Sequence, residues 1–217
     1  MFRQMLVAQW KFTRSALLGI SLLVAITPAL VMRLSLVQIV NQTPRDLIVM
    51  TELLGGGLAI MAALLGVIVQ HQPWNEDLKA RFVYVLSLPI SWPRFLLRRV
   101  GGALLLLLVP ALFVWLGGAI AVAMVPLPPT LHTFAFGIAV RFYLASVFCY
   151  AVWSALVHLS GKRAGAVGLA ILLLVLVAPF GLIWLGFGHS VGAVGGWLIN
   201  PPGPLAVFFS RWALIDV

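Results

Sequence analysis

Long apolar runs separated by short polar segments dominate the hydrophobic pattern of the chain. Each run is about as long as the roughly 20 helical residues that cross a bilayer core, and none alternates like a transmembrane strand. Because lipid offers the backbone no hydrogen-bond partner, each run must satisfy its own peptide groups as a helix. The pattern therefore predicts an all-α, polytopic transmembrane bundle with five spans, over residues 17–40, 48–70, 101–125, 133–159 and 164–187.

Composition supports a membrane protein. The 217 residues are 63% hydrophobic and only 9% charged, whereas about a quarter of the residues of a globular domain are charged. A soluble domain of this size could not cover its surface with so few charges. We therefore expect a single transmembrane domain over residues 1–217.

The basic residues are distributed by topology, so the net charge of +9 does not indicate nucleic-acid binding. Of the fourteen Lys and Arg residues, Arg33, Arg45 and Arg211 fall on the outer side if the N-terminus is cytoplasmic, and Arg141 falls within a span. The other ten then lie on the inner side, as the enrichment of Lys and Arg in cytoplasmic loops requires. We expect a cytoplasmic N-terminus and basic groups that contact membrane lipids.

Residues 1–14 have an amphipathic pattern. At 100° per residue the apolar and basic side chains separate onto opposite faces, with Phe2, Met5, Leu6, Trp10 and Phe12 on one and Arg3, Lys11 and Arg14 on the other. This pattern predicts an interfacial elbow helix whose apolar face enters the acyl chains and whose cations meet lipid phosphates. The alternative is that these residues are simply the polar start of the first span.

The segment 74–99, "WNEDLKARFVYVLSLPISWPRFLLRR", is the most polar part of the chain and lies between two apolar runs. Residues 70–73 are expected to stop the second span, and Pro89 to end a short helix. Ser91 is a plausible N-cap, and Pro93 fits the first turn of the next helix. The segment is either a solvated loop whose Arg98 and Arg99 anchor helix ends to phosphates, or a docking surface for a soluble partner.

The sequence of this segment resembles the type-2 ABC exporter permease family. In that family a Leu-Pro-(Ile/Val)-Ser stretch followed by basic residues lies between the second and third spans and contains the coupling helix that meets the ATP-binding subunit. The matching residues are Leu88, Pro89, Ile90, Ser91 and Arg94, with Arg98 or Arg99 near the family's Lys and with Glu76 and Asp77 ahead of them. The likeness in layout covers most of the chain, whereas the sequence-specific match is confined to this segment.

The resemblance implies a permease subunit that moves a lipophilic or amphipathic substrate out through the inner membrane of a prokaryote. A second permease copy, or a related permease, would complete the path. A separate ABC ATPase subunit would bind ATP and Mg and would act on the coupling segment 74–99. The residues expected to mediate this coupling are Glu76, Asp77, Lys79, Arg81, Leu88, Pro89, Ser91, Arg94 and Arg98.

The C-terminal region departs from the family, which has six spans. Pro201, Pro202 and Pro204 interrupt any helix there, and the apolar tail after them is too short to cross a bilayer. We expect residues 189–217 to form an outer hairpin or an incomplete sixth span.

The chain lacks the residues for its own chemistry. No Gly-x-x-x-x-Gly-Lys-Ser/Thr motif occurs, and the single Cys149 excludes both an internal disulfide and a cysteine-built metal site. We therefore expect no catalytic residue, no metal and no cofactor bound by this chain. The alternative function is a non-transporting membrane anchor or assembly subunit that recruits a cytosolic partner through its central loop.

One charge lies inside a predicted span. An unpaired Arg141 would cost roughly 2.5–3.5 kcal/mol in the bilayer centre. It either extends to the outer headgroups or faces the bundle, where it pairs with Glu52 or meets an anionic group of the substrate.

Overall fold

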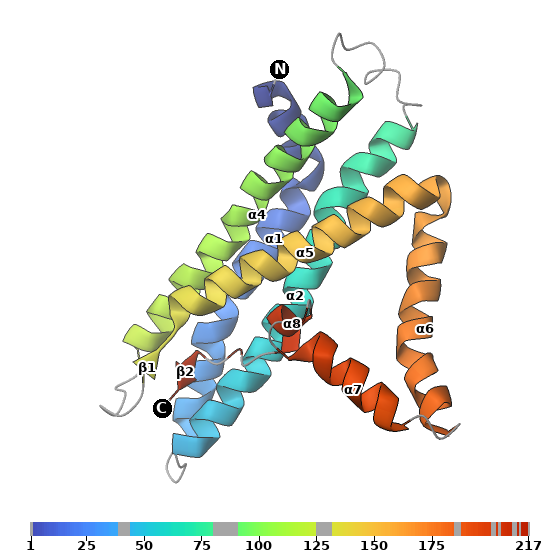
Figure 1. Ribbon diagram of the computed structural model, residues 1–217. Coiled ribbons are helices and arrows are strands. Elements are labelled where there is room, and N and C mark those ends of the chain that lie inside the picture. Colours follow the sequence, from blue (N-terminus) through green and yellow to red (C-terminus); the bar gives the residue numbers. More distant parts are fainter. Residues whose placement is uncertain are drawn as a thin grey trace. The chain divides into compact units, whose positions relative to one another are not determined.

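The computed structural model describes residues 2–38, 44–79, 91–124, 132–184, 188–200, 203, 205–209, 212 and 214–216. Its longer helices are α1 (Phe2–Gln38), α2 (Pro44–Lys79), α4 (Trp92–Ala123), α5 (Ala135–Ser160) and α6 (Ala164–Trp184) (Figure 1). The short helices are α7 (Gly188–Ile199) and α8 (Ala206–Phe209), and a 3-10 turn, Gly161–Arg163, joins α5 to α6. Two short strands, β1 (His132–Thr133) and β2 (Ile215–Asp216), pair with each other in antiparallel fashion.

The all-α membrane character predicted from sequence is confirmed, but the described residues contain four candidate spans and not the five predicted. Four helical stretches among the described residues are long and apolar enough to cross a membrane: Arg3–Arg33, Leu54–Lys79, Trp92–Ala123 and Ala135–Ser160. The fifth predicted span, 164–187, is helical over Ala164–Trp184 but is not among the four, and many of its side chains lie outside the described residues.

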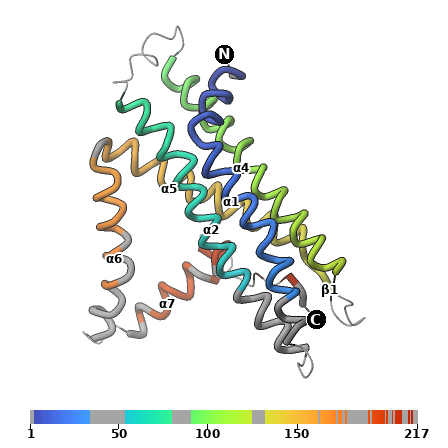
Figure 2. The backbone as a smooth tube through the Cα atoms, turned by 180° about the vertical axis from the view of Figure 1, so that it is seen from behind, coloured from blue at the N-terminus to red at the C-terminus, as the bar shows by residue number. Residues whose placement is uncertain are grey.

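The helices group into two compact units. Unit 1 comprises Met1–Tyr150 with Arg211–Val217, and unit 2 comprises Ala151–Ser210. In unit 1, α1 lies between α2 and α4 and contacts both along much of its length (Figure 2). The start of α1, the end of α2 and the start of α4 meet at one end, which we call the N-terminal end, and β1 and β2 lie at the opposite, ribbon end.

A buried stripe on α1 explains its central position. Side chains at intervals of three or four residues are buried, as expected for one face of a helix: Met5, Gln9, Thr13, Leu17, Ser21, Val24, Pro28 and Met32. Leu18, Leu22 and Ile26 on the other face are about half exposed and suit lipid. The hydroxyl of Thr13 donates to the carbonyl oxygen of Gln9 at 2.8 Å, so this polar side chain is satisfied within its own helix.

The residues predicted to form an interfacial elbow are the first turns of α1, which runs without interruption from Phe2 to Gln38 and packs in unit 1 through Met5, Gln9 and Thr13. Arg3, Lys11 and Arg14 are exposed, as the amphipathic pattern predicts, but Phe12 of the predicted apolar face is 40% exposed. Contact of this segment with lipid headgroups stays a prediction. Trp10 is half-buried.

The end of the second span was also predicted wrongly. Pro73 lies inside α2, which continues to Lys79 instead of stopping at residues 70–73. Proline is tolerated within membrane helices because neighbouring helices compensate for the lost backbone bond, and Pro73 and Trp74 are both buried. The restart of the chain was predicted correctly: Ser91 occupies the N-cap position of α4 and Pro93 its first turn, although the Ser91 side chain makes no capping hydrogen bond.

Small residues let the helices of unit 1 approach closely. A Cβ atom on Gly117 of α4 would lie 2.3 Å from the carbonyl oxygen of Ala25 in α1, and one on Gly66 of α2 would lie 2.3 Å from that of Ser146 in α5. Helices in lipid associate through such backbone contacts because there is little hydrophobic force between them. Glycine is therefore needed at both crossings.

The described residues at the C-terminal end return to unit 1, and none of them belongs to a helix long enough to cross a bilayer. Trp212 and Leu214 are almost fully buried, and the amide of Phe134 donates to the carbonyl oxygen of Leu214 at 3.0 Å. The Trp212 backbone packs so closely on α2 that a Cβ on Gly55 would lie 2.3 Å from its carbonyl oxygen. The tail thus joins α2, β1 and α5 at the ribbon end, opposite the N-terminal end.

Unit 2 holds the rest of the C-terminal region. In it, the Trp153 ring packs on Gly168 of α6, and α7, with 12 residues, is too short to cross a bilayer. After α7 the chain turns back, with the amide of Leu205 donating to the carbonyl oxygen of Leu198 at 3.0 Å. This return fits the predicted hairpin over part of 189–217, without a further spanning helix among its described residues.

Gly66→Ala should destabilise unit 1 because the added methyl group overlaps the backbone of α5; overpacking typically costs about 1–3 kcal/mol. Gly56→Ala, on the same helix with no atom within 4 Å of its Cβ position, is the matched control and should be neutral or slightly stabilising. Unfolding free energies from SDS titration in mixed micelles compare the two. Equal effects would contradict the proposed close crossing.

Candidate functional site

Helices α2 and α4 are joined at the N-terminal end by an ion pair between Asp77 and Arg99. The guanidinium Nη1 of Arg99 donates to Oδ2 of Asp77, and the two residues are 22 positions apart in the chain. The arginine side chain is only 6% exposed and the aspartate side chain 25%. This pair joins the end of α2 to the start of α4, the two helix ends that flank residues 80–91 in the chain.

Aromatic rings flank the arginine. Its Cζ atom lies 5.9 Å from the ring centroid of Trp74 and 6.0 Å from that of Phe95, within range of cation–π attraction. Phe95 in turn stacks on Trp92, with ring centroids 5.5 Å apart. A charge in this position is shielded from water by rings on both α2 and α4, so its pairing with Asp77 occurs at low dielectric.

Gln9 connects α1 to the same place. Its side-chain amide Nε2 donates to the backbone carbonyl oxygen of Arg99 at 3.0 Å, and Gln9 is 7% exposed. A Cβ at position 102 would lie 2.3 Å from Oε1 of Gln9, so the glycine there leaves room for this orientation of the Gln9 side chain. We call Gln9, Trp74, Asp77, Phe95 and Arg99 the inner cluster; it holds the N-terminal ends of α1 and α4 and the C-terminal end of α2 together.

The inner cluster contains more polar groups than its own hydrogen bonds use. Oε1 of Gln9, and Nε and Nη2 of Arg99, are buried and have no hydrogen-bond partner among the described residues; Nε2 of Gln70 and Oε1 of Gln72, on the last turns of α2, are in the same condition. A buried polar atom without a hydrogen-bond partner lowers the stability of the folded protein. A buried ion pair also adds little net stability, and its best-attested role is to fix the register between the elements it joins.

The structure separates the predicted coupling residues into two groups. Glu76 pairs with Lys79 at 2.6 Å on the surface, where such a pair contributes little, and Ser91 and Arg94 are exposed. Asp77 instead points into the inner cluster. Arg98 is half-buried, and Arg81, Leu88 and Pro89 lie outside the described residues.

Arg99 is the residue that sequence reasoning misjudged. It was expected either to anchor a helix end to lipid phosphates or to stand for the basic residue of the coupling motif, but it is 5% exposed and paired with Asp77. The sequence did carry a signal for this burial. Arg99 lies four residues after Phe95 and three before Gly102, so all three fall on the same buried face of α4. Gln9 and Gly102 were not identified from sequence at all.

The predicted embedded charge is placed only in part. Arg141 lies on α5, two turns from the ribbon end, and is half-buried. The side chain of Glu52 is outside the described residues, so the Arg141–Glu52 pair stays a prediction. No group of three or more His, Cys, Asp or Glu side chains suited to a metal occurs among the residues that were described.

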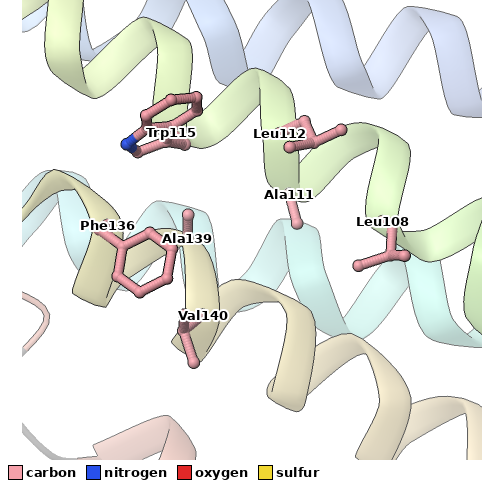
Figure 3. Close-up of a pocket in the computed structure, with 7 residues that line it drawn as sticks. All are labelled: Leu108, Ala111, Leu112, Trp115, Phe136, Ala139 and Val140. Carbon is pink, nitrogen blue, oxygen red and sulfur yellow. The ribbon is translucent and has the colours of Figure 1, made fainter.

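A second feature of unit 1 is an apolar cavity of about 230 Å³ between α4 and α5 (Figure 3). Ala111 and Ala139 are buried and form its floor, while larger side chains from both helices form its walls. We call it the α4–α5 groove. Its full lining is Leu108, Ala111, Leu112, Trp115, Phe136, Ala139 and Val140.

Comparison of the chain with models of protein families, with curated proteins and with solved structures gives no match. The function must therefore be argued from the residues and their arrangement.

Asp77→Ala should destabilise the protein by up to about 3 kcal/mol, because it leaves the Arg99 charge buried without its partner. The neighbouring Glu76→Ala removes only a surface pair and should cost less than about 1 kcal/mol. Adding Arg99→Met to Asp77→Ala should recover stability, since the stranded charge is then removed. SDS-titration unfolding measures all three; equal costs for Asp77→Ala and Glu76→Ala would show that the pair is not buried.

Proposed function

We propose that the chain is the membrane-spanning permease subunit of an ABC exporter, driven by ATP hydrolysis in a separate subunit. The observation that carries this proposal is the Asp77–Arg99 pair, which ties together the ends of the two helices that flank the coupling-like segment in the chain. Both helices are long and apolar enough to cross a membrane, so a force on the segment between them would act on both at once. A loop that is only solvated would not need an ion pair between the helices on either side of it.

The inner cluster supplies a mechanical path into unit 1. Force on the segment reaches α2 through Lys79 and α4 through Trp92, and the ion pair keeps the two helix ends from separating. Because Gln9 binds the backbone at Arg99, α1 moves with them. ATP-driven closure of the partner subunit would thus move the ends of three helices together, and exposed Ser91 and Arg94 would meet that partner.

The remaining parts of the proposal follow from the resemblance. The N-terminal end would face the cytoplasm of a prokaryote and the ribbon end its exterior. A second copy of the chain, or a related permease, would complete the path. ATP and Mg would bind to the ATPase, and no catalytic residue is assigned to this chain.

Site-directed crosslinking tests the proposal. In a Cys149→Ser background, which removes the single native cysteine, Ser91→Cys or Arg94→Cys is labelled with a benzophenone maleimide in native membranes. We expect photolysis to join either position to an ATPase with a Walker motif, in a yield that changes when ATP is added. Thr133→Cys, exposed at the ribbon end, is the control and should give no such product.

The outcomes separate the candidate functions. If Arg94→Cys reacts only with a soluble protein that lacks a Walker motif, the chain is the anchor or assembly subunit. If the ATPase is captured equally from Thr133→Cys, the segment is not its docking site and the proposed coupling is wrong.

A further inference from the structure

The α4–α5 groove opens on an exposed apolar surface of unit 1. Both of its helices are candidate membrane spans, and the side chains on its rim are strongly exposed: Phe136 is 70% exposed and Leu112 is 55% exposed. In a bilayer these side chains contact lipid, not water. The medium beside the groove is therefore hydrocarbon, and whatever enters it comes from within the membrane.

The groove is built by the pattern of small and large residues. Ala111 and Ala139 are each 6% exposed and face each other from α4 and α5 (Figure 3). Leu108, Leu112 and Trp115 rise beside the floor on α4, and Phe136 and Val140 rise on α5. The hollow thus runs along α4 for the eight residues from Leu108 to Trp115, a rise of about 10 Å.

Size limits what can occupy the groove. A helix with its side chains is about 10 Å wide, so a helix of a second copy would lie over the groove and enter it only with single side chains. Drug-sized ligands need pockets of about 300–1,000 Å³, so the space suits something narrower, namely a single hydrocarbon chain.

The lining also excludes a polar occupant. Six of the seven lining residues are aliphatic or phenyl, and the only polar atom among their side chains is the indole nitrogen of Trp115. A headgroup placed there would lose its hydrogen bonds to water without replacement. The groove can therefore take the chain of an amphiphile but not its head.

We infer that the α4–α5 groove binds a single acyl or alkyl chain of a membrane amphiphile. If the chain is an exporter, an inference that rests on the proposed function, the substrate class is a lipid-like amphiphile whose tail lies in this groove. Helix α4 links the two sites, since it carries Arg99 of the inner cluster at one end and the groove wall further along. A push transmitted through α4 therefore displaces one wall of the groove.

Photolabelling of the purified chain tests the groove without any ATPase. The full chain is placed in nanodiscs of diphytanoyl phosphatidylcholine, whose methyl-branched chains are wider than a straight chain, with a rising fraction of straight-chain phosphatidylcholine that carries a diazirine on its acyl chain. Peptide mass spectrometry then locates the adducts. We expect adducts on residues 108–115 and 136–140 that saturate as the probe fraction rises. Labelling that rises linearly there, as on the rest of the lipid-facing surface, would overturn the site.

Matched variants sharpen the test. Leu112→Trp and Val140→Trp fill the groove, whereas Leu116→Trp and Leu144→Trp place the same bulk one turn away, at positions that are 48% and 50% exposed and outside the lining. The first pair should lose the saturable adducts and the second pair should keep them. Equal labelling of all four variants would also overturn the inference.

The exporter is tested separately, because an ATPase product from Arg94→Cys does not depend on the groove. Saturable labelling of the groove together with no ATPase crosslink would support the lipid site and contradict the exporter. An ATPase crosslink without saturable labelling would support the exporter and contradict this substrate class. With both present, a single-chain lysophospholipid should stimulate ATP hydrolysis in the complex with Leu116→Trp and not in that with Leu112→Trp. Equal stimulation of both variants would show that the groove is not used in transport.

Discussion

One part-buried ion pair ties the end of α2 to the start of α4 in unit 1. Arg99 lies on the face of α4 that packs against other helices, where a guanidinium without a partner would be strongly destabilising. Asp77 is its partner, and that requirement fixes the end of α2 beside the start of α4. Two hydrophobic side chains of similar volume would hold the helices as well or better, so the pair is better explained by register and by transmission of force than by stability.

The two opposite faces of α4 make different contacts because their residues differ in size. Toward α1, Gly117 allows backbone contact with Ala25, and Gly102 leaves room for Gln9, which reaches the carbonyl of Arg99. Toward lipid, leucine and tryptophan surround the buried Ala111 and leave a hollow beside α5. One rigid helix thus connects a polar cluster at the N-terminal end with an apolar groove nearer the ribbon end.

Local chemistry was readable from the sequence, whereas pairing between distant segments was not. The apolar runs predicted four spans correctly, and Ser91 with Pro93 predicted the start of α4, because length and capping are local properties. Pro73 was taken as a stop, since its tolerance depends on neighbouring helices. The Asp77–Arg99 pair, the Gln9 contact and the strand pairing of β1 with β2 join residues far apart in the chain, and single-sequence periodicity carries no information on them.

Hydrogen exchange of the wild-type chain in nanodiscs tests most directly whether the inner cluster makes three helix ends one mechanical body. The amides around Gln9, Asp77 and Arg99 should open with a common free energy, because no one of these ends can unfold without breaking the shared contacts. Arg99→Met should increase exchange at all three ends, including that of α1. Independent opening of the end of α2, with α1 and α4 still protected, would contradict the account.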